Sequence, residues 1–312
     1  MLERSLALDI VRLTEASALA SARFMGAGDE AAADAAAVEA MASSLKELVI
    51  DGTVVLGEGT AASGALLPSG TRVGQGELHL DLALDALEGT NICATGGPNA
   101  MSIVAVGEPG SFLPVPEVYM EKLVVGPGAR GAINLSRPLK ENLKNVAGAL
   151  GKSIEELTVV VLDRPRNKDA IDAIRRLSAR LRLIGDGDVS SAIATAMADS
   201  GVDCLVGMGG APQGVLSAVA LKCVGGDFQG QLKFRDPAES DAAAAMGLDG
   251  PDRALTIDDL ARGEDLVFVA TGVTDGDLLK GVRFVPGAAY TQSLVLALRS
   301  RVIRRIESFH AI

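Results

Sequence analysis

Residues 158–224 read "TVVVLDRPRNKDAIDAIRRLSARLRLIGDGDVSSAIATAMADSGVDCLVGMGGAPQGVLSAVALKCV". Three apolar runs in this stretch are typical of buried strands, and the segments between them have helical spacing. Strands are predicted at 158–163, 181–185 and 202–210, and helices at 168–180, 189–198 and 212–224. Because helices of about 10–15 residues alternate with apolar strands, we expect a largely parallel or mixed sheet with helices outside it.

The pattern before this stretch is different, since two helical segments precede a run of strands. Helices are predicted at 3–25, 30–49 and 138–150, and strands at 53–59, 78–85, 101–107, 117–126 and, after the quoted stretch, 265–271. A length of 312 residues suggests two domains. We place the boundary near residue 150, giving domains of 1–150 and 151–312.

Composition excludes several classes of function. The chain has 29 Lys and Arg against 40 Asp and Glu, a net charge of −11, with 3% aromatic residues and no Trp. This balance argues against binding nucleic acid or an anionic membrane. Two histidines cannot form a three-His zinc site, and no apolar run reaches the roughly 18 residues of a membrane span. Three widely spaced cysteines and the lack of a signal-peptide pattern predict buried thiols in the cytoplasm.

The stretch "LDLALDALEGT" (80–90) carries the strongest local signal for chemistry. An apolar strand is expected to end at Asp85, and Glu88 follows on the next turn. Carboxylates placed in this way can bind one hard divalent cation. The alternative interpretation is a polar turn with a helix cap.

Two further carboxylates have unusual surroundings. Glu58 lies between glycines in "LGEG" (56–59), and Asp34 lies on a small, apolar helix face in "EAAADAAAVEA" (30–40). An apolar face would desolvate Asp34 and raise its pKa unless a cation accompanies it. The alternative is that Asp34 lies on a solvated face.

Three turns in the second half suit phosphate or sugar. Arg164 and Arg166 in "LDRPR" can hold a phosphate bidentately, and Asp186 and Asp188 in "GDGD" can accept hydrogen bonds from sugar hydroxyls. The glycine-rich "GMGGAPQG" (207–214) lacks the Lys-Ser/Thr of a P-loop. Each turn alone could be an ordinary α/β connection, but turns at the strand ends of one sheet favour a shared crevice.

Together these motifs resemble class II fructose-1,6-bisphosphatases, the bacterial branch of the lithium-sensitive, metal-dependent sugar phosphatase superfamily. The similar blocks cover nearly the whole chain, in family order. They are "RLTEASALA" (12–20), "IDGTVVLGEG" (50–59), "LDALEGTN" (84–91), "PEVYMEKLVVGPGA" (116–129), "ENLKNVAGALGKS" (141–153), "VLDRPR" (161–166), "DGDVSSAIATAM" (186–197), "GVDCLVGMGGAPQGV" (201–215) and "ATGVTDGDLLKGV" (270–282).

The resemblance implies a role for each matching position. The implied metal ligands are Asp34, Glu58, Asp85, Glu88 and Gln213, and the implied catalytic residues are Thr90, Glu88 and Glu58. The implied substrate-binding residues are Glu88, Gly89, Thr90, Tyr119, Arg164, Pro165, Arg166, Asp186, Gly187, Asp188 and Gly210.

The resemblance also implies a fold and an activity. The fold is an αβαβα sandwich of two mixed sheets with helices between and outside them, in which 1–150 bind metal and 151–312 bind the sugar phosphate. The activity is hydrolysis of the 1-phosphate of fructose 1,6-bisphosphate by water activated on Mg²⁺ or Mn²⁺, and the resemblance leaves sedoheptulose 1,7-bisphosphate open as a second substrate. The implied state is a cytoplasmic homodimer or tetramer that acts on a phosphorylated sugar.

The chain departs from the family pattern near the implied site. Gln213 replaces the glutamate of "GGAPEG", residues 60–65 replace an acidic segment, and Ala86 replaces a proline. Near the first interhelical turn, where the family usually has basic residues, this chain has Ala27 and Glu30. Two alternatives therefore stay open: a degenerate homologue that binds sugar phosphates or a partner subunit with little or no catalysis, and a phosphatase with a shifted substrate.

Overall fold

The computed structural model of the chain describes residues 2–59, 64–248 and 253–312, which form two compact units. Unit 1 comprises residues 1–112 and 263–312, and unit 2 comprises residues 113–262. This division differs from the expected boundary near residue 150. The physical reason is strand pairing, because Tyr119–Val125 pairs within unit 2, whereas Val267–Gly272 returns to pair with Met101–Gly107 of unit 1.

The described part of unit 1 contains a mixed sheet with the order β12-β13-β11-β4-β3-β1-β2, in which β14 pairs with β13. Its strands are β1 (Asp51–Leu56), β2 (Arg72–Val73), β3 (His79–Glu88), β4 (Met101–Gly107), β11 (Val267–Gly272), β12 (Arg283–Val285), β13 (Ala288–Ala297) and β14 (Val302–Ala311). β1 and β3 are parallel, whereas β3, β4, β11 and β13 are antiparallel neighbours.

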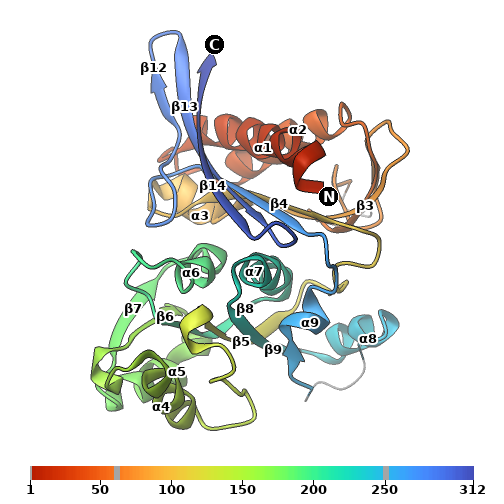
Figure 1. Cartoon of the computed structure of the whole chain (residues 1–312). Coiled ribbons are helices and arrows are strands. Elements are labelled where there is room, and N and C mark those ends of the chain that lie inside the picture. The colour runs from red at the N-terminus through yellow and green to blue at the C-terminus, as the bar shows by residue number, and fades with distance from the viewer. Residues whose placement is uncertain (1, 60–63, 249–252) are drawn as a thin grey trace. The chain divides into compact units, whose positions relative to one another are not determined.

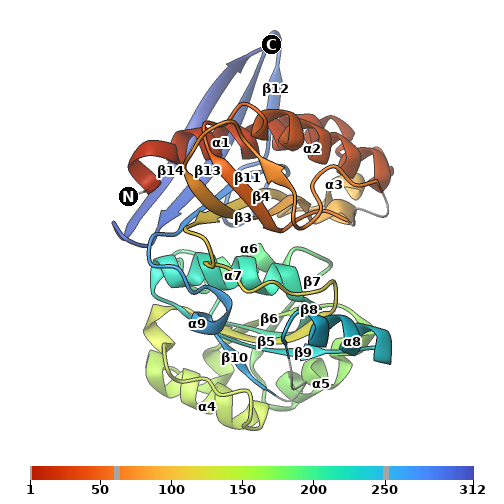
Figure 2. The same cartoon turned by 90° about the vertical axis from the view of Figure 1, so that its right-hand side faces the viewer.

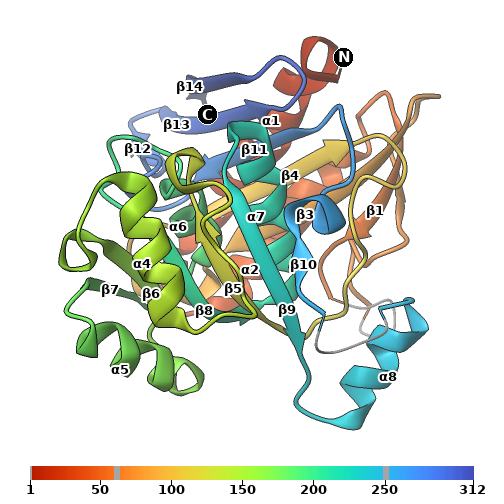
Figure 3. The same cartoon turned by 60° about the horizontal axis from the view of Figure 1, so that its bottom comes forward.

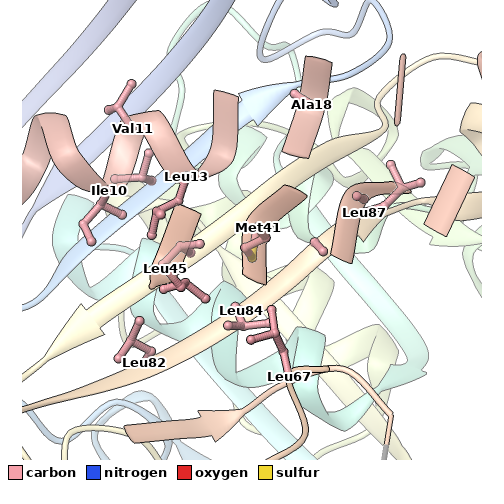
Figure 4. Packing of buried hydrophobic residues seen from close by; sticks show 14 of the residues in the cluster. Ile10, Val11, Leu13, Ala18, Met41, Leu45, Leu67, Leu82, Leu84 and Leu87 are labelled. Atoms are coloured by element: carbon pink, nitrogen blue, oxygen red, sulfur yellow. The ribbon is translucent and has the colours of Figure 1, made fainter. Parts of the chain in front are cut away.

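Helices α1 (Leu2–Ser21) and α2 (Glu30–Leu45) lie side by side on one face of this sheet (Figure 1). Leu6, Ile10 and Leu13 of α1 recur at helical spacing, and all three are buried. Small residues on α2 allow it to approach β3 closely, and Met41 and Leu45 pack in the same core (Figure 4). The apolar stripe predicted from sequence is therefore the face that covers the sheet.

Unit 2 has its own mixed sheet, which in the described residues has the order β10-β9-β5-β8-β6-β7. Its strands are β5 (Tyr119–Val125), β6 (Thr158–Leu162), β7 (Arg180–Ile184), β8 (Cys204–Gly210), β9 (Asp227–Lys233) and β10 (Leu255–Thr256). β7, β6 and β8 are parallel neighbours, and β5 runs antiparallel to both β8 and β9.

Helices cover both faces of the unit 2 sheet (Figure 2). α4 (Leu139–Leu150) and α5 (Lys168–Arg176) pack on one face, and α6 (Asp188–Ala194) and α7 (Ala211–Val224) lie on the other. Two further helices, α8 (Pro237–Ala245) and α9 (Ile257–Leu260), follow β9. The predicted α/β class, with mixed sheets and helices layered on them, is confirmed.

Several expected elements differ in extent from the observed ones. The predicted helix at 168–180 ends at Arg176, because Ser178 has a φ of 59° that a helix cannot accommodate. The predicted strand 78–85 continues to Glu88. α3 (Thr90–Thr95), β9 and the β13–β14 hairpin were not expected from the sequence.

Within the described ranges, no helix is long and apolar enough to cross a membrane. The predicted burial of Cys93, Cys204 and Cys223 is confirmed. Burial raises the pKa of the Cys204 thiol to about 12. Cys204 is therefore an unreactive core residue at neutral pH.

Candidate functional site

Asp85 and Glu88 lie on β3, with a β-bulge between them. Asp85 pairs with Ile103 of β4, and Glu88 pairs with Met101, so β3 has one more residue than β4 across this interval. Residues 101 and 103 share a face of β4, and the extra residue brings Asp85 and Glu88 to one face of β3. The bulge thus replaces the expected strand end and turn, and both carboxyl groups are largely buried.

Glu58 is brought to the same region by β1, which runs parallel to β3. Strands that are parallel end at the same edge of a sheet, and Glu58 follows the end of β1. Its Oε1 accepts a hydrogen bond of 2.6 Å from the backbone N–H of Ala86, inside the bulge. Any side chain larger than hydrogen at Gly57 would overlap the carbonyl of Leu67, so glycine is required there.

Asp34 approaches this region from α2. The hydroxyl of Ser17 on α1 lies 2.8 Å from the carbonyl oxygen of Ala37 and 2.9 Å from that of Ala86. This contact places α2 beside the bulge, and Asp34 lies one turn before Ala37. Partial burial raises the pKa of Asp34, as the sequence predicted, because desolvation disfavours its charged form.

Gly89 and Thr90 lie where β3 turns into α3. Gly89 has a φ of 85°, which favours glycine, and this conformation makes the chain turn directly after Glu88. The hydroxyl of Thr90 donates a 3.1 Å hydrogen bond to the carbonyl of Leu87. Asn91 in turn donates to Glu30 of α2 at 2.6 Å, so Glu30 braces α3 against α2.

The four carboxylates have the right chemistry for a hard divalent cation but are not gathered into a coordination sphere. All four donors are oxygens, which suits Mg²⁺ or Mn²⁺, and the desolvated Asp34 would be stabilised by a nearby cation. Across the described residues, no three Asp, Glu, His or Cys side chains lie close enough together to hold a metal ion. The donor set fits the ion, and its assignment as a metal site stays a prediction.

The phosphate- and sugar-binding residues predicted in unit 2 lie at one edge of its sheet. β6, β7 and β8 are parallel and end at Leu162, Ile184 and Gly210. The segments after them carry residues 164–166, residues 186–188 and, in the first turn of α7, Gln213. Tyr119, the first residue of β5, pairs with Gly210, the last residue of β8. The expected convergence at strand ends is thus observed within unit 2.

Arg166 is held against Tyr119. Its guanidinium carbon lies 4.4 Å from the centre of the Tyr119 ring, and its Nε donates a 3.0 Å hydrogen bond to the carbonyl of Met208. Asn167 fixes the same segment, because its side chain bonds to both the N–H and the carbonyl of Met208 at 2.6 Å and 3.2 Å. Arg166 and Lys233 also border a cavity of about 440 Å³ between this sheet and helices α4 and α5.

Asp188 has a different environment from the one expected. Its Oδ2 lies 2.6 Å from Nζ of Lys122, and the two side chains are 6% and 1% exposed. A methyl group at Gly209 would overlap this carboxylate oxygen, so glycine leaves room for the pair. The Asp188 carboxylate therefore has the buried Lys122 ammonium group as its partner. If Asp188 also accepts hydrogen bonds from sugar hydroxyls, it does so while paired with Lys122. Asp186, which accepts a hydrogen bond from Gly187 N–H at 3.0 Å, is half-buried.

Gln213 lies in the first turn of α7, where Pro212 precedes it. Its Oε1 lies in the space that a side chain at Gly210 would fill, so these two predicted site residues are adjacent. Its carbonyl accepts a 2.7 Å hydrogen bond from the hydroxyl of Ser217.

Sequence reasoning missed Lys122 and Arg235. Lys122 was hidden because an apolar strand with one charged residue gives no signal for a buried ion pair. Arg235 follows β9, and β9 itself was not predicted. Of the segment 60–65, residues 60–63 lie outside the described residues.

Unit 1 therefore carries carboxylates on β3 and directly after β1, and unit 2 carries guanidinium groups at one edge of its sheet. Oxygen donors that suit a divalent cation, together with guanidinium groups that suit a phosphate, are the residue types that metal-dependent phosphatases use.

Comparison with known proteins agrees with this class. Residues 4–310 match the family model described as bacterial fructose-1,6-bisphosphatase, glpX-encoded. The chain is 43% identical to fructose-1,6-bisphosphatase 1 class 2 of Escherichia coli (strain K12), over 99% of this chain and 96% of that protein. It is 41% identical to the D-fructose 1,6-bisphosphatase class 2/sedoheptulose 1,7-bisphosphatase of Synechococcus elongatus, over 99% and 97%. The chain therefore belongs to the bacterial class II fructose-1,6-bisphosphatase family, and the resemblance seen in the sequence is confirmed.

Proposed function

We propose that this protein hydrolyses the 1-phosphate of fructose 1,6-bisphosphate, with sedoheptulose 1,7-bisphosphate as a second substrate. The family match over nearly the full chain carries this proposal. The relative from Synechococcus elongatus is named for both activities, which supports the second substrate.

The proposed cofactor is Mg²⁺ or Mn²⁺, held by Asp34, Glu58, Asp85 and Glu88, with Gln213 as an additional oxygen ligand. When bound, a divalent cation neutralises phosphate charge and lowers the pKa of a coordinated water. The bulge in β3 supports the assignment of Asp85 and Glu88, because it brings two carboxylate oxygen donors to one face of the strand.

The protein's own residues bind and orient the substrate. Glu88, Gly89 and Thr90 border the phosphate that leaves, and the Thr90 hydroxyl can exchange its bond to Leu87 for one to a phosphate oxygen or the attacking water. Arg164 and Arg166, with Pro165 between them, bind the other phosphate, and Tyr119 holds Arg166 in place. Residues 186–188 and Gly210 border the sugar. Fixing the far end of the substrate in this way sets the register of the reacting end.

Unit 1 thus supplies the metal-binding residues and unit 2 most of the sugar-phosphate-binding residues. We also propose that the protein acts in the cytoplasm as a homodimer or tetramer. Light scattering coupled to size-exclusion chromatography tests the oligomeric state directly.

Phosphate release from fructose 1,6-bisphosphate tests the function. We expect release with Mn²⁺ or Mg²⁺, none with EDTA, and none from an Asp85→Ala variant. A thermal-shift series with sugar phosphates runs in parallel. Binding of sugar phosphates with no phosphate release would instead support the non-catalytic homologue, for which Gln213 is the observation in favour. Faster release from another phosphate ester would support a shifted substrate.

A further inference from the structure

Arg235 lies at the edge of the unit 2 sheet that carries the predicted phosphate-binding residues. β9 lies beside β5 (Figure 3). The two strands pair so that Lys233 lies opposite Tyr119, and Arg235 follows two residues later. The chain then enters α8. The register of β9 therefore brings Arg235 to the same strand end as Tyr119 and Gly210.

Arg235 shares the ring of Tyr119 with Arg166. The guanidinium carbon of Arg235 lies 5.2 Å from the ring centre, and that of Arg166 lies 4.4 Å from it. A guanidinium group that stacks on an aromatic ring uses its flat face, so its N–H groups stay available at its edge. The N–H donors of Arg166 and Arg235 therefore lie around the same ring, that of Tyr119.

Glu239 holds Arg235 in this orientation. Both Nε and Nη2 of Arg235 contact Oε1 of Glu239, and the backbone N–H of Arg235 donates to Oε2 at 2.7 Å. Glu239 is itself fixed in the first turn of α8, where its N–H donates to the capping carboxylate of Asp236 at 3.0 Å. Glu239 is 12% exposed, whereas Arg235 is 59% exposed. Glu239, which is itself fixed by its own contacts, therefore holds the guanidinium group of Arg235 in an accessible position.

The charges at this edge favour an anion. Among the described side chains, no carboxylate pairs with Arg164 or Arg166, whose hydrogen bonds go to the carbonyls of Asp163 and Met208 at 3.3 Å and 3.0 Å. Arg235 brings a third guanidinium group to this edge. Its own carboxylate partner is Glu239, with Asp236 nearby, and Lys233 at the same strand end pairs with Glu121 at 3.0 Å. Like charges at one edge repel one another, and a phosphate dianion would relieve that repulsion.

We propose that Arg235 is a third guanidinium contact for the phosphate that is not cleaved, and that Glu239 positions it. This inference rests on the proposed function and extends it. Arg235 then makes the protein select substrates with two phosphates, because a substrate without the far phosphate gains nothing from it. The contact is equally strong before and during the reaction, so it acts on binding rather than on the chemical step.

The test compares Arg235→Gln with Arg253→Gln as a matched control. Arg253 is also exposed, at 63%, and also pairs with an aspartate, Asp259, at 2.5 Å. Calorimetry measures binding of fructose 6-phosphate, which carries only the far phosphate, and of fructose 1-phosphate, which lacks it. Steady-state kinetics measure KM and kcat for fructose 1,6-bisphosphate.

We expect Arg235→Gln to weaken fructose 6-phosphate binding about tenfold, since a charge-assisted hydrogen bond is lost. KM for the bisphosphate should rise by a similar factor with kcat unchanged, and fructose 1-phosphate binding should not change. Arg253→Gln should leave all of these values unchanged. Equal fructose 6-phosphate affinity in wild type and Arg235→Gln overturns the proposal, as does an equal loss in both variants.

Failure of the proposed function gives a different result. Wild-type protein would then release no phosphate from the bisphosphate, while Arg235→Gln would still weaken fructose 6-phosphate binding. That result would support the Arg235 contact and overturn only the proposed catalytic function. If wild-type protein binds no fructose 6-phosphate, both the contact and the sugar-phosphate function are overturned.

Discussion

Asp34 is a carboxylate whose surroundings disfavour its charge. Desolvation raises its pKa above the ordinary value of 3.8. Protonated Asp34 therefore favours the folded state. This contribution to the free energy of unfolding is fully present below pH 3.8 and is lost as the pH rises through the pKa that Asp34 has in the folded protein. At neutral pH the ionised Asp34 destabilises the metal-free protein, and a bound cation would reverse this effect.

We accordingly predict that Asp34→Asn raises the melting temperature of the metal-free protein. The expected rise is roughly 1–2 °C, which is small because the Asp34 side chain is only half-buried. The rise in melting temperature on adding Mn²⁺ should shrink in the variant, because one ligand is lost. Differential scanning calorimetry with and without Mn²⁺ measures both effects. An equal response to Mn²⁺ in the two proteins would show that Asp34 is not a ligand.

Gln213 is the residue expected to limit activity relative to the family. It lies in the first turn of α7, where the free N–H groups favour negative charge. Gln213→Glu adds a charged oxygen ligand without changing side-chain size. We expect tighter Mn²⁺ binding and a rate about tenfold higher, equivalent to about 1.4 kcal/mol.

Mn²⁺ titration and phosphate-release rates check this prediction, with Gln75→Glu as the control. Gln75 is an exposed glutamine whose side chain donates a hydrogen bond to the carbonyl of Lys46, and it is not among the predicted ligands. Equal metal affinity and equal rates in wild type and Gln213→Glu would falsify the hypothesis. Tighter metal binding with no gain in rate would point instead to the lost acidic residues of segment 60–65.

Among the structural elements, β5 contributes side chains to both faces of the unit 2 sheet. Its odd residues, such as Tyr119, face the side of α4 and α5, and Lys122 faces the side of α6 and α7. The Lys122–Asp188 pair fixes the start of α6, and with it the turn 186–188. Buried ion pairs add little net stability, but removing one partner leaves an uncompensated charge.

We predict that Lys122→Met lowers the free energy of unfolding by about 3–5 kcal/mol. Adding Asp188→Asn should recover part of this loss, because the orphaned charge is removed. The control is Lys222→Met, which breaks a pair with Asp258, whose side chain is 72% exposed, and should cost about 1 kcal/mol or less. Urea unfolding measures all four proteins. Equal losses at Lys122 and Lys222 would contradict the argument.

The elements also show what the sequence could and could not predict. β4 was predicted at its observed bounds, since seven consecutive apolar or small residues leave few alternatives. β9 was missed because its buried positions are Phe228, Gly230 and Leu232, and a glycine contributes no apolar signal. Gly230 is required, since a side chain there would overlap the sulfur of Met120. The β3 bulge was missed because it depends on the register with β4, which local sequence does not encode.

On the scale of the whole molecule, the sequence predicted the strand ends that carry the candidate site residues but not the division into two units. Motifs at strand ends identified the loops after β6, β7 and β8, because a strand–turn–helix pattern is local. The division into units was not predicted, because it depends on β11 returning to β4 after 150 intervening residues of unit 2. Long-range pairing of this kind leaves no mark on local composition.

Unit 2 is a continuous segment, and its two ends lie together. The N–H of Leu113 donates a 3.0 Å hydrogen bond to the carbonyl of Leu260, and both side chains are buried. Chain ends that meet in this way are typical of inserted domains, which can fold alone. The core between α4, α5 and the sheet is formed within this segment.

We therefore predict that residues 113–262 fold as an isolated domain and bind fructose 6-phosphate. Thermal unfolding should be cooperative, and fructose 6-phosphate should raise the melting temperature, because Tyr119, Arg164, Arg166 and Arg235 all lie in this segment. An Arg166→Ala version of the same domain is the matched control and should lose the ligand-induced shift while keeping its fold. Mn²⁺ should have no effect, because Asp34, Glu58, Asp85 and Glu88 are absent. A non-cooperative transition would show that unit 2 depends on unit 1 for folding. A cooperative transition without a ligand response would show that the far-phosphate residues are insufficient by themselves.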